Sequence, residues 1–459
     1  MKLVYEKGPY LKDSERTNKI MKRVLLALVP IILFSFYKNG ILPFYKGYTN
    51  IYGLFQPLIL ILTAGLTSLG TEFLYNKYLL KIKNPLQGKY AFFPGLFFSL
   101  LMSINTPLWM IVMGAFFATV VGKLLFGGFG HNIFNPALVG ALFITVSYGA
   151  LIPGGYLNAF ELDTITGPTA LATNYIDSFP KVIEAFGGIG NYIFGFIPGT
   201  LGETPKLLII MSFIFLAVTK TIKYLIPLTY VGVVFITTFV IGSVNGLDIT
   251  FPLFQIFTGG LLLGAVFMAT DPVTTPTTRL GQVLFGIGLG LLTVIFRFLT
   301  PYPEGVLTSI LTMNMLVILI DELGDQSQRK IILKTITLII GLGLIIGTGF
   351  LIGNKIKSPV EVDNNYQIIE KANQKYQVSQ KGFGGLIKAE IIFEKDLIKE
   401  INIMSQNESL WQNIEKEDYL QKLIDQQDNL EALDTVSGTT ITSQALKDLI
   451  KNTKDDYKE

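Results

Sequence analysis

Residues 207–242 read LLIIMSFIFLAVTKTIKYLIPLTYVGVVFITTFVIG. Two apolar runs, 207–222 and 225–242, are separated by a short connection; Lys223 lies in it, and Lys220 lies near the end of the first run. A helix needs about 20 apolar residues to cross the hydrocarbon core of a bilayer, and each run approaches that length. The stretch therefore predicts two neighbouring membrane helices joined by a basic turn.

The same alternation of apolar runs and polar connections extends over most of the chain. Counting those two, the runs fall at 24–36, 54–75, 91–104, 107–124, 132–150, 207–222, 225–242, 253–269, 280–298, 305–320 and 332–353. Several are short for a full span, and Gly and Pro interrupt them, as in Ser103-Ile104-Asn105-Thr106-Pro107. Such breaks are tolerated at membrane depth only where the backbone packs on protein or lines a cavity. We expect a polytopic α-helical membrane protein with about 10–11 transmembrane helices, some of them broken.

The composition agrees with a membrane protein and excludes several cofactor classes. Half of the 459 residues are hydrophobic and 15% are charged, whereas about a quarter of a soluble domain is charged. The formal net charge of +3 is too small to indicate a nucleic-acid partner. The chain has no cysteine, so it cannot hold an iron–sulfur cluster through thiolates or attach a c-type haem. Its one histidine, His131, has no suitable companion ligands nearby in the sequence, and we expect no metal site.

Basic residues predict the orientation of the bundle. The N-terminus is rich in Lys and Arg and lacks a cleavage site, so the first run is expected to remain as an uncleaved span. With that end in the cytoplasm, the other basic clusters also fall on the cytoplasmic side: Lys77, Lys81, Lys83 and Lys89; Lys220 and Lys223; Arg279; and Arg329, Lys330 and Lys334. The acidic loop 151–206 and the tail 360–459 are then expected outside the cytoplasm.

The tail has a different composition, rich in Lys, Glu, Gln and Asn. Residues 388–393 and 397–403 have the pattern of two strands joined by a short polar turn. Segments 416–430 and 443–452 have the pattern of helices. We expect a small α+β domain of about 100 residues, near the low end of the size that folds independently.

A seven-residue phrase occurs twice. Residues 163–169 read DTITGPT and residues 434–440 read DTVSGTT. Asp, Ser, Thr and Gly dominate turns, so two similar turns are one explanation. The other is that a separate modifying enzyme recognises the phrase. The predicted topology puts both copies on the outer side, which favours the second explanation.

Acidic side chains within or beside apolar runs are functional candidates, because an ionised group is costly inside a bilayer. Glu72 lies within a run, and Asp271 and Glu203 lie at the ends of runs. We expect Asp271 and Glu203 on a path for ions. The structural alternative for Asp271 is N-capping of the turn at Pro272.

Two further segments have a functional and a structural interpretation. The segment Gly127–Pro136 could line a cofactor or ion site with its backbone, because glycine permits close approach, or could be a helix break needed for packing. The hydroxyls of the other segment could contact a flavin ring or satisfy the backbone of a broken helix; they belong to Thr274, Thr275, Thr277 and Thr278.

Several long motifs, in a fixed order, resemble one family of membrane proteins. They are GGFGHNIFNPA at 127–137, IPGTLGET at 197–204, FMATDPVTTP at 267–276, RLGQ at 279–282 and YPEG at 302–305. They resemble the RnfD subunits of the Rnf ion-translocating ferredoxin:NAD oxidoreductases, and are similar to the NqrB subunits of the sodium-pumping NADH:quinone reductases. The tail, with GFGG at 382–385 and the second seven-residue phrase, resembles the extracytoplasmic FMN-binding domain of the RnfG subunits. The resemblance implies a membrane domain at 1–325, an anchor helix and linker at 326–359, and an FMN-binding domain at 360–459.

In that family a flavin transferase links FMN, through its phosphate, to the last threonine of such a phrase. The resemblance therefore implies covalent FMN at Thr169 and Thr440, two in all. The phrases around them contribute Asp163, Gly167, Asp434, Ser437 and Gly438. Pro168 and Thr439 stand where the family usually has alanine. A non-covalent flavin such as riboflavin is a further cofactor to expect.

The sequence thus predicts a membrane electron-relay subunit that carries covalent FMN on the outer face. It would couple electron transfer to movement of Na⁺ or H⁺ within a redox-driven ion translocase of the cell membrane, without being catalytically complete alone. The implied partners are Rnf-type subunits with iron–sulfur clusters and an NAD site, a flavin transferase for maturation, and membrane lipid. The alternatives are a flavinylated module for extracellular electron transfer and a secondary transporter without covalent flavin, which broken helices and buried acids also suit.

Overall fold

The computed structural model describes residues 17–86, 90–148, 183, 188–197, 199–300, 305–329, 331–355, 366–372, 375–381, 386–394, 397–406, 414–415, 418–427, 430 and 440–458. Contacts between residues divide the chain into two compact units, Met1–Lys357 and Ser358–Glu459. Each unit has its own hydrophobic core.

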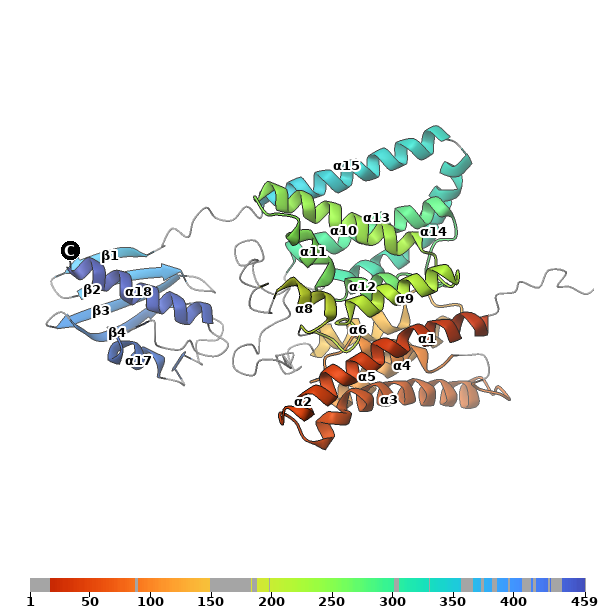
Figure 1. Ribbon diagram of the computed structural model, residues 1–459, viewed down its shortest axis with the longest axis horizontal. Coiled ribbons are helices and arrows are strands. Elements are labelled where there is room, and N and C mark those ends of the chain that lie inside the picture. Colours follow the sequence, from red (N-terminus) through yellow and green to blue (C-terminus); the bar gives the residue numbers. More distant parts are fainter. Residues whose placement is uncertain are drawn as a thin grey trace, which may run out of the picture. The chain divides into compact units, whose positions relative to one another are not determined.

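The first unit is a bundle of helices (Figure 1). Two of its long helices, α1 and α3, continue directly into π-helical turns. The helical elements are α1 (Thr17–Phe36), η1 (Tyr37–Ile41), α2 (Leu42–Tyr45), α3 (Ile51–Leu74), η2 (Tyr75–Leu79), α4 (Phe93–Leu100), α5 (Leu108–Val120), η3 (Leu124–Phe126), α6 (Pro136–Tyr148), α8 (Ile189–Phe194), α9 (Lys206–Val218), α10 (Leu225–Val244), α11 (Thr250–Phe257), α12 (Leu261–Leu263), η5 (Gly264–Met268), α13 (Arg279–Leu299), α14 (Gly305–Arg329) and α15 (Ile331–Lys355).

Seven helices among the described residues are long and apolar enough to cross a membrane. An eighth candidate is the pair 250–257 and 261–268, which is bent by 64°. The predicted polytopic architecture with broken helices is confirmed. The count is lower than the eleven apolar runs because the other runs form shorter helices, including α4 of 8 residues and α6 and α9 of 13 residues each.

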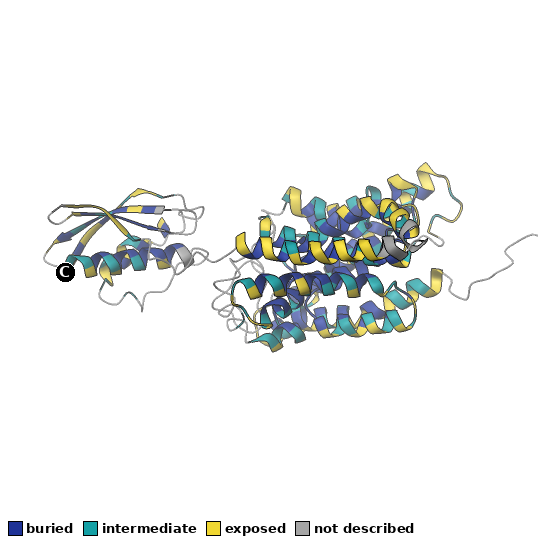
Figure 2. Ribbon diagram, turned by 90° about the horizontal axis from the view of Figure 1, so that it is seen from above, coloured by how far each residue is buried: buried dark blue, intermediate teal, exposed yellow. Residues whose placement is uncertain are grey.

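Small residues allow the long helices to approach one another, as is usual in membrane bundles. A Cβ atom at Gly290 of α13 would lie 2.5 Å from Val233 of α10. A Cβ atom at Gly349 of α15 would lie 2.9 Å from Val240, which also belongs to α10. Helix α15 therefore packs on α10 as part of the first unit. Figure 2 shows buried residues mainly in the interior of the bundle and exposed residues mainly on its outside.

The second unit is an antiparallel sheet with helices, matching the predicted α+β domain. Its strands, β1 (Gln367–Ala372), β2 (Lys375–Lys381), β3 (Leu386–Glu394) and β4 (Leu397–Ser405), are hydrogen-bonded in the order β1-β2-β3-β4. Helices α17 (Tyr419–Asp425) and α18 (Thr440–Lys458) follow. The predicted strand pair is confirmed, with Glu394 opposite Leu397 at the turn. The sequence patterns did not predict β1 and β2.

Helix α18 packs its apolar side on the sheet. Leu446, Leu449 and Ile450 are buried with Val378 and Ile391 in one core. The ring of Tyr457, near the end of α18, stacks on Phe393 with centroids 4.0 Å apart. The helix begins at Thr440, three residues earlier than the pattern predicted.

Candidate functional site

The predicted flavin-attachment residues are mostly outside the described part of the chain. This applies to Asp163, Gly167 and Thr169 in the first phrase and to Asp434, Ser437 and Gly438 in the second. Thr440 is the first residue of α18. The site that the described residues do form lies in the membrane unit.

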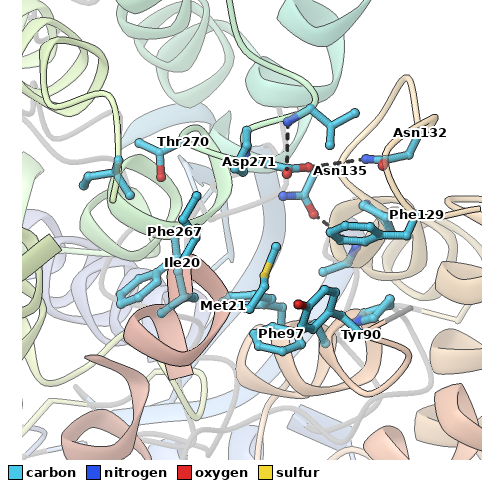
Figure 3. A pocket seen from close by; sticks show the side chains of 18 of the residues that line it. Ile20, Met21, Tyr90, Phe97, Phe129, Asn132, Asn135, Phe267, Thr270 and Asp271 are labelled. Carbon is cyan, nitrogen blue, oxygen red and sulfur yellow. Dashed lines mark hydrogen bonds between the residues drawn. The ribbon is translucent and has the colours of Figure 1, made fainter. Parts of the chain in front are cut away.

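A pocket opens between five parts of the bundle, and Figure 3 shows it from close by. The space between its walls is about 830 Å³, open solvent included. Its walls come from α1, from residues around α4, from the segment 123–137, from the end of α9 and from η5 with the turn after it. The aromatic lining residues are Tyr90, Phe93, Phe97, Phe129 and Phe267, and the polar ones are Lys123, Asn132, Asn135, Thr221, Thr270 and Asp271.

The glycine-rich segment before α6 forms one wall of this pocket. Gly127 and Gly128 have φ angles of 110° and 92°, a region that side chains other than glycine rarely adopt. The turn that they make is closed by a hydrogen bond from the Gly128 N–H to the Lys123 carbonyl at 3.0 Å. It leads the chain back so that Asn132 and Asn135 reach the pocket. The glycine-rich segment therefore both interrupts the helix and lines the cavity.

Asn135 links three elements. Its Oδ1 accepts hydrogen bonds from the N–H groups of Ala137 at 3.1 Å and Leu138 at 3.5 Å, which caps the start of α6. Its Nδ2 donates to the carbonyl of Met268 at 3.2 Å, at the end of the π-helical turn η5. Its own N–H donates to Asn314 of α14 at 3.2 Å.

Asp271, one of the two predicted ion-path residues, lies in the pocket. Its Oδ2 accepts a hydrogen bond from Asn132 at 3.3 Å, and its Oδ1 accepts one from the Val273 N–H at 3.4 Å. The second bond is the local capping of the Pro272 turn that was the structural alternative. Burial raises the pKa of the Asp271 carboxyl above its ordinary value, and the hydrogen bonds from Val273 and Asn132 oppose that rise.

The four threonines after Asp271 do not line the pocket. Asp321 of α14 accepts five hydrogen bonds, of 2.8 to 3.0 Å, from four groups, the N–H and hydroxyl of Thr277 and of Thr278. Lys223 donates to the carbonyl and hydroxyl of Thr275 at 3.2 and 2.8 Å. For Thr275, Thr277 and Thr278 these contacts fit the interpretation as support for the backbone of a broken segment.

Lys123 is a lining residue that the sequence patterns did not single out. Its Nζ lies 2.7 Å from Glu72 Oε2, and both side chains are almost fully buried, at 3% and 1% exposure. The signal was present in the sequence: a lysine closes the apolar run 107–124, and an acid lies inside the run 54–75. Two buried ionisable groups on neighbouring helices are expected to pair.

Glu203, the other predicted ion-path residue, is at a different place. It is buried just before α9, whereas Thr221 and Ile222 of the pocket follow that helix. Thirteen helical residues separate them, about 20 Å. Two buried lysines lie in the same region: Lys38 donates to the Ile197 carbonyl and Lys206 to the Gly259 carbonyl. The structure does not bring Asp271 and Glu203 into one site.

No group of three or more His, Cys, Asp or Glu side chains converges as a metal site within the described residues. The pocket instead offers a row of aromatic rings beside amide, carboxyl and ammonium groups. That combination suits a flat aromatic ligand with polar edges, since apolar walls bury the rings and a few polar groups fix the orientation.

Comparisons with known proteins match both units of the chain. Residues 4–330 match the model of the NQR2, RnfD, RnfE family, and residues 382–455 match the FMN-binding domain.

Three relatives are similar to the membrane unit. The D subunit of the proton-translocating ferredoxin:NAD(+) oxidoreductase complex of Clostridium ljungdahlii is 35% identical over 320 residues, 69% of this chain and 92% of the relative. The D subunit of the Na(+)-translocating ferredoxin:NAD(+) oxidoreductase complex of Acetobacterium woodii is 31% identical over 324 residues, 70% and 93% of the two chains. The B subunit of the Na(+)-translocating NADH-quinone reductase of Chromohalobacter salexigens is 35% identical over 244 residues, 52% and 59%.

Proposed function

The chain belongs to the NQR2, RnfD, RnfE family, and from that premise we propose that it is the flavin-bearing membrane subunit of an Rnf-type ion-translocating ferredoxin:NAD oxidoreductase. The observation that carries the proposal is the union, in one chain, of this membrane unit with an FMN-binding domain. Redox chemistry is supplied by flavin, and the membrane bundle supplies the route for ions.

The pocket holds a non-covalent flavin in this proposal. A bound flavin takes up and passes on electrons there. The rings of Tyr90, Phe97 and Phe129 would bury the flat ring system. Asn132 would contact its polar edge, because the Oδ1 atom of Asn132 has no hydrogen-bond partner among the described residues.

Two covalent FMN groups are proposed at Thr169 and Thr440, attached by a flavin transferase. Support for Thr440 comes from its place as the first residue of α18, a helix of 19 residues. The start of a helix presents free N–H groups and a partial positive charge, which favour a phosphate. Residues of the two phrases, Asp163 and Asp434 among them, would be read by the transferase.

The proposed orientation follows from the basic residues. The N-terminus and the pocket face the cytoplasm, and Glu203, the loop that contains Thr169 and residues 360–459 lie toward the outer side. Asp271 and Glu203 would then mark the two ends of the ion path, about 20 Å apart along α9. The relatives named above translocate either protons or Na⁺, so the ion proposed here is Na⁺ or H⁺.

Other subunits complete the enzyme. Because this chain has no cysteine, iron–sulfur centres must come from partner subunits, which would also hold the NAD site. We propose that residues 1–325 form the membrane domain that contacts lipid and these partners. Residues 326–359 would anchor the FMN-binding domain at 360–459.

The proposal is tested in inverted membrane vesicles from a strain that lacks this chain. We expect loss of ferredoxin-dependent NAD⁺ reduction and of the ion gradient that it drives. Supplying the intact chain should restore both activities, and supplying a Thr169→Ala/Thr440→Ala variant should restore neither. Unchanged ferredoxin-dependent NAD⁺ reduction in the deletion strain would refute the assignment and would favour the extracellular electron-transfer alternative.

A further inference from the structure

Lys123 is placed in the pocket by the backbone around it. It follows α5 and precedes η3, and its carbonyl accepts the hydrogen bond that closes the glycine turn. Its side chain lines the pocket, and its Nζ lies 5.7 Å from the centre of the Phe129 ring, another lining residue. The ammonium group is therefore held at the cavity wall rather than in solvent.

The partner of Lys123 lies behind it. Glu72 accepts from Lys123 at 2.7 Å but is not among the residues that line the pocket. Of the two residues, Lys123 lines the cavity, and Glu72 of α3 does not. Within the described part of the chain, Glu72 Oε1 is buried without a hydrogen-bond partner, and Lys123 is the ion-pair partner of this carboxylate.

A neutral pair precedes the charged one and joins α3 to α5. The hydroxyl of Thr119 donates to that of Ser68 at 2.8 Å, and these residues precede Lys123 and Glu72 by four positions each. This contact and the Lys123–Glu72 ion pair both join α3 to the region at the end of α5.

We propose that Lys123 sets the redox preference of the flavin in the pocket, a role that rests on the proposed function. An electron delivered by a one-electron carrier of a partner subunit adds one negative charge to the ring, and no bond forms or breaks. The ammonium of Lys123 stabilises that charge, because an electrostatic interaction is strong where water is excluded. Glu72 reduces the effect by its own opposite charge.

The arrangement also orients the ligand. Lys123 lies beside Phe129, whereas Asp271 comes from the turn after η5 and is bonded to Asn132. A ring whose reduced form carries its negative charge on one edge would turn that edge toward Lys123 and away from Asp271. Lys123 acts here as a binding residue for the charged edge, and Glu72 as the residue that positions it.

The test compares midpoint potentials of the non-covalent flavin in the full chain, measured by spectroelectrochemistry. A Thr169→Ala/Thr440→Ala background removes the proposed covalent flavins from the signal. Glu72→Gln should raise the potential, because the counter-charge is lost. Adding Lys123→Met to Glu72→Gln should reverse the rise and reduce the preference for the reduced ring at least tenfold, which equals 59 mV for a one-electron couple.

Two controls separate charge from packing. Lys123→Arg in the Glu72→Gln background keeps the charge and should keep the raised potential. Thr119→Val removes the hydrogen bond to Ser68 between α3 and α5 without changing charge. The midpoint potential should then equal that of the parent protein. If neither Glu72→Gln nor Lys123→Met changes the midpoint potential of the bound flavin, the proposed role of Lys123 is wrong. If the double variant loses its flavin, the absence of a rise in Glu72→Gln alone overturns it. A parent protein with no released flavin refutes the proposed pocket flavin itself.

Discussion

Single polar side chains hold the pocket together. Asn135 caps α6 and binds the Met268 carbonyl, and Asn132 connects the glycine turn to Asp271. The sequence motif GGFGHNIFNPA marked this region, but composition could not decide between a cofactor site and a helix break. The answer depends on which carbonyl each amide reaches, and residues 133 positions apart make that contact.

Replacing Asn135 tests this role. Asn135→Ala should lower stability by about 1–2 kcal/mol through the lost cap and should also release the non-covalent flavin. Asn245→Ala is the matched control, because Asn245 bonds the Ile241 and Gly353 carbonyls and does not line the pocket. We expect a comparable fall in melting temperature for the control with its flavin retained. Equal flavin content in the two variants would contradict the role.

Asp271 carries a pH-dependent prediction. Burial raises its native pKa, above an unfolded value near 3.9. The folded state then holds the proton more tightly, so the stability that the carboxyl contributes is complete below pH ~3.9 and is lost as pH rises through the native pKa. Asp271→Asn should therefore raise the melting temperature at pH 7 and change it little at pH 4. A variant that is less stable than the wild type at pH 7 would show that the ionised form is the favoured one.

Irregular elements shape the site more than the long helices do. The pocket needs the π-helical turn η5, the bent pair of α11 and α12 and the positive-φ glycines. A π-helical turn has the composition of the helix around it, so periodicity predicted the apolar run 253–269 but not its bend. In the tail, alternation predicted β3 and β4. The sequences of β1 and β2 are largely polar and did not indicate strands, although both strands pair through their backbones.

The loop after Asp271 depends on Asp321, at the level of elements. Hydrogen bonds to an ionised group are stronger than neutral ones, and Asp321 accepts five of them from two residues. Asp321→Asn should expose the segment 274–278 to limited proteolysis and lower the melting temperature. The neighbouring exposed residue provides the control, and Glu322→Gln should leave the proteolytic pattern unchanged. If Asp321→Asn leaves the proteolysis of segment 274–278 unchanged, Asp321 does not hold this loop in place.

At the scale of the whole molecule, two units with separate cores share one chain. The apolar runs and the polar tail were enough to predict that division in outline. They could not predict that α15, expected as an anchor, also packs on α10 through Gly349 and Gly353. Close packing of this kind depends on where small residues of distant helices meet, which a single sequence does not record.

The core of the second unit gives a direct stability prediction. Leu449 is fully buried there and Leu397 is 49% exposed. In the separate fragment 358–459, Leu449→Ala should cost about 2–5 kcal/mol of unfolding free energy, measured by urea denaturation. Leu397→Ala should cost less than about 0.5 kcal/mol. A fragment that shows no cooperative transition would mean that the unit depends on the membrane bundle.

The central claim is that this membrane protein carries flavin at defined residues. The most direct measurement is mass spectrometry of peptides from the purified chain, produced in a host with an active flavin transferase. We expect the added mass of FMN less water on the peptides that contain Thr169 and Thr440, and we expect its loss in the matching Thr→Ala variants. Both peptides recovered without the added mass would contradict it.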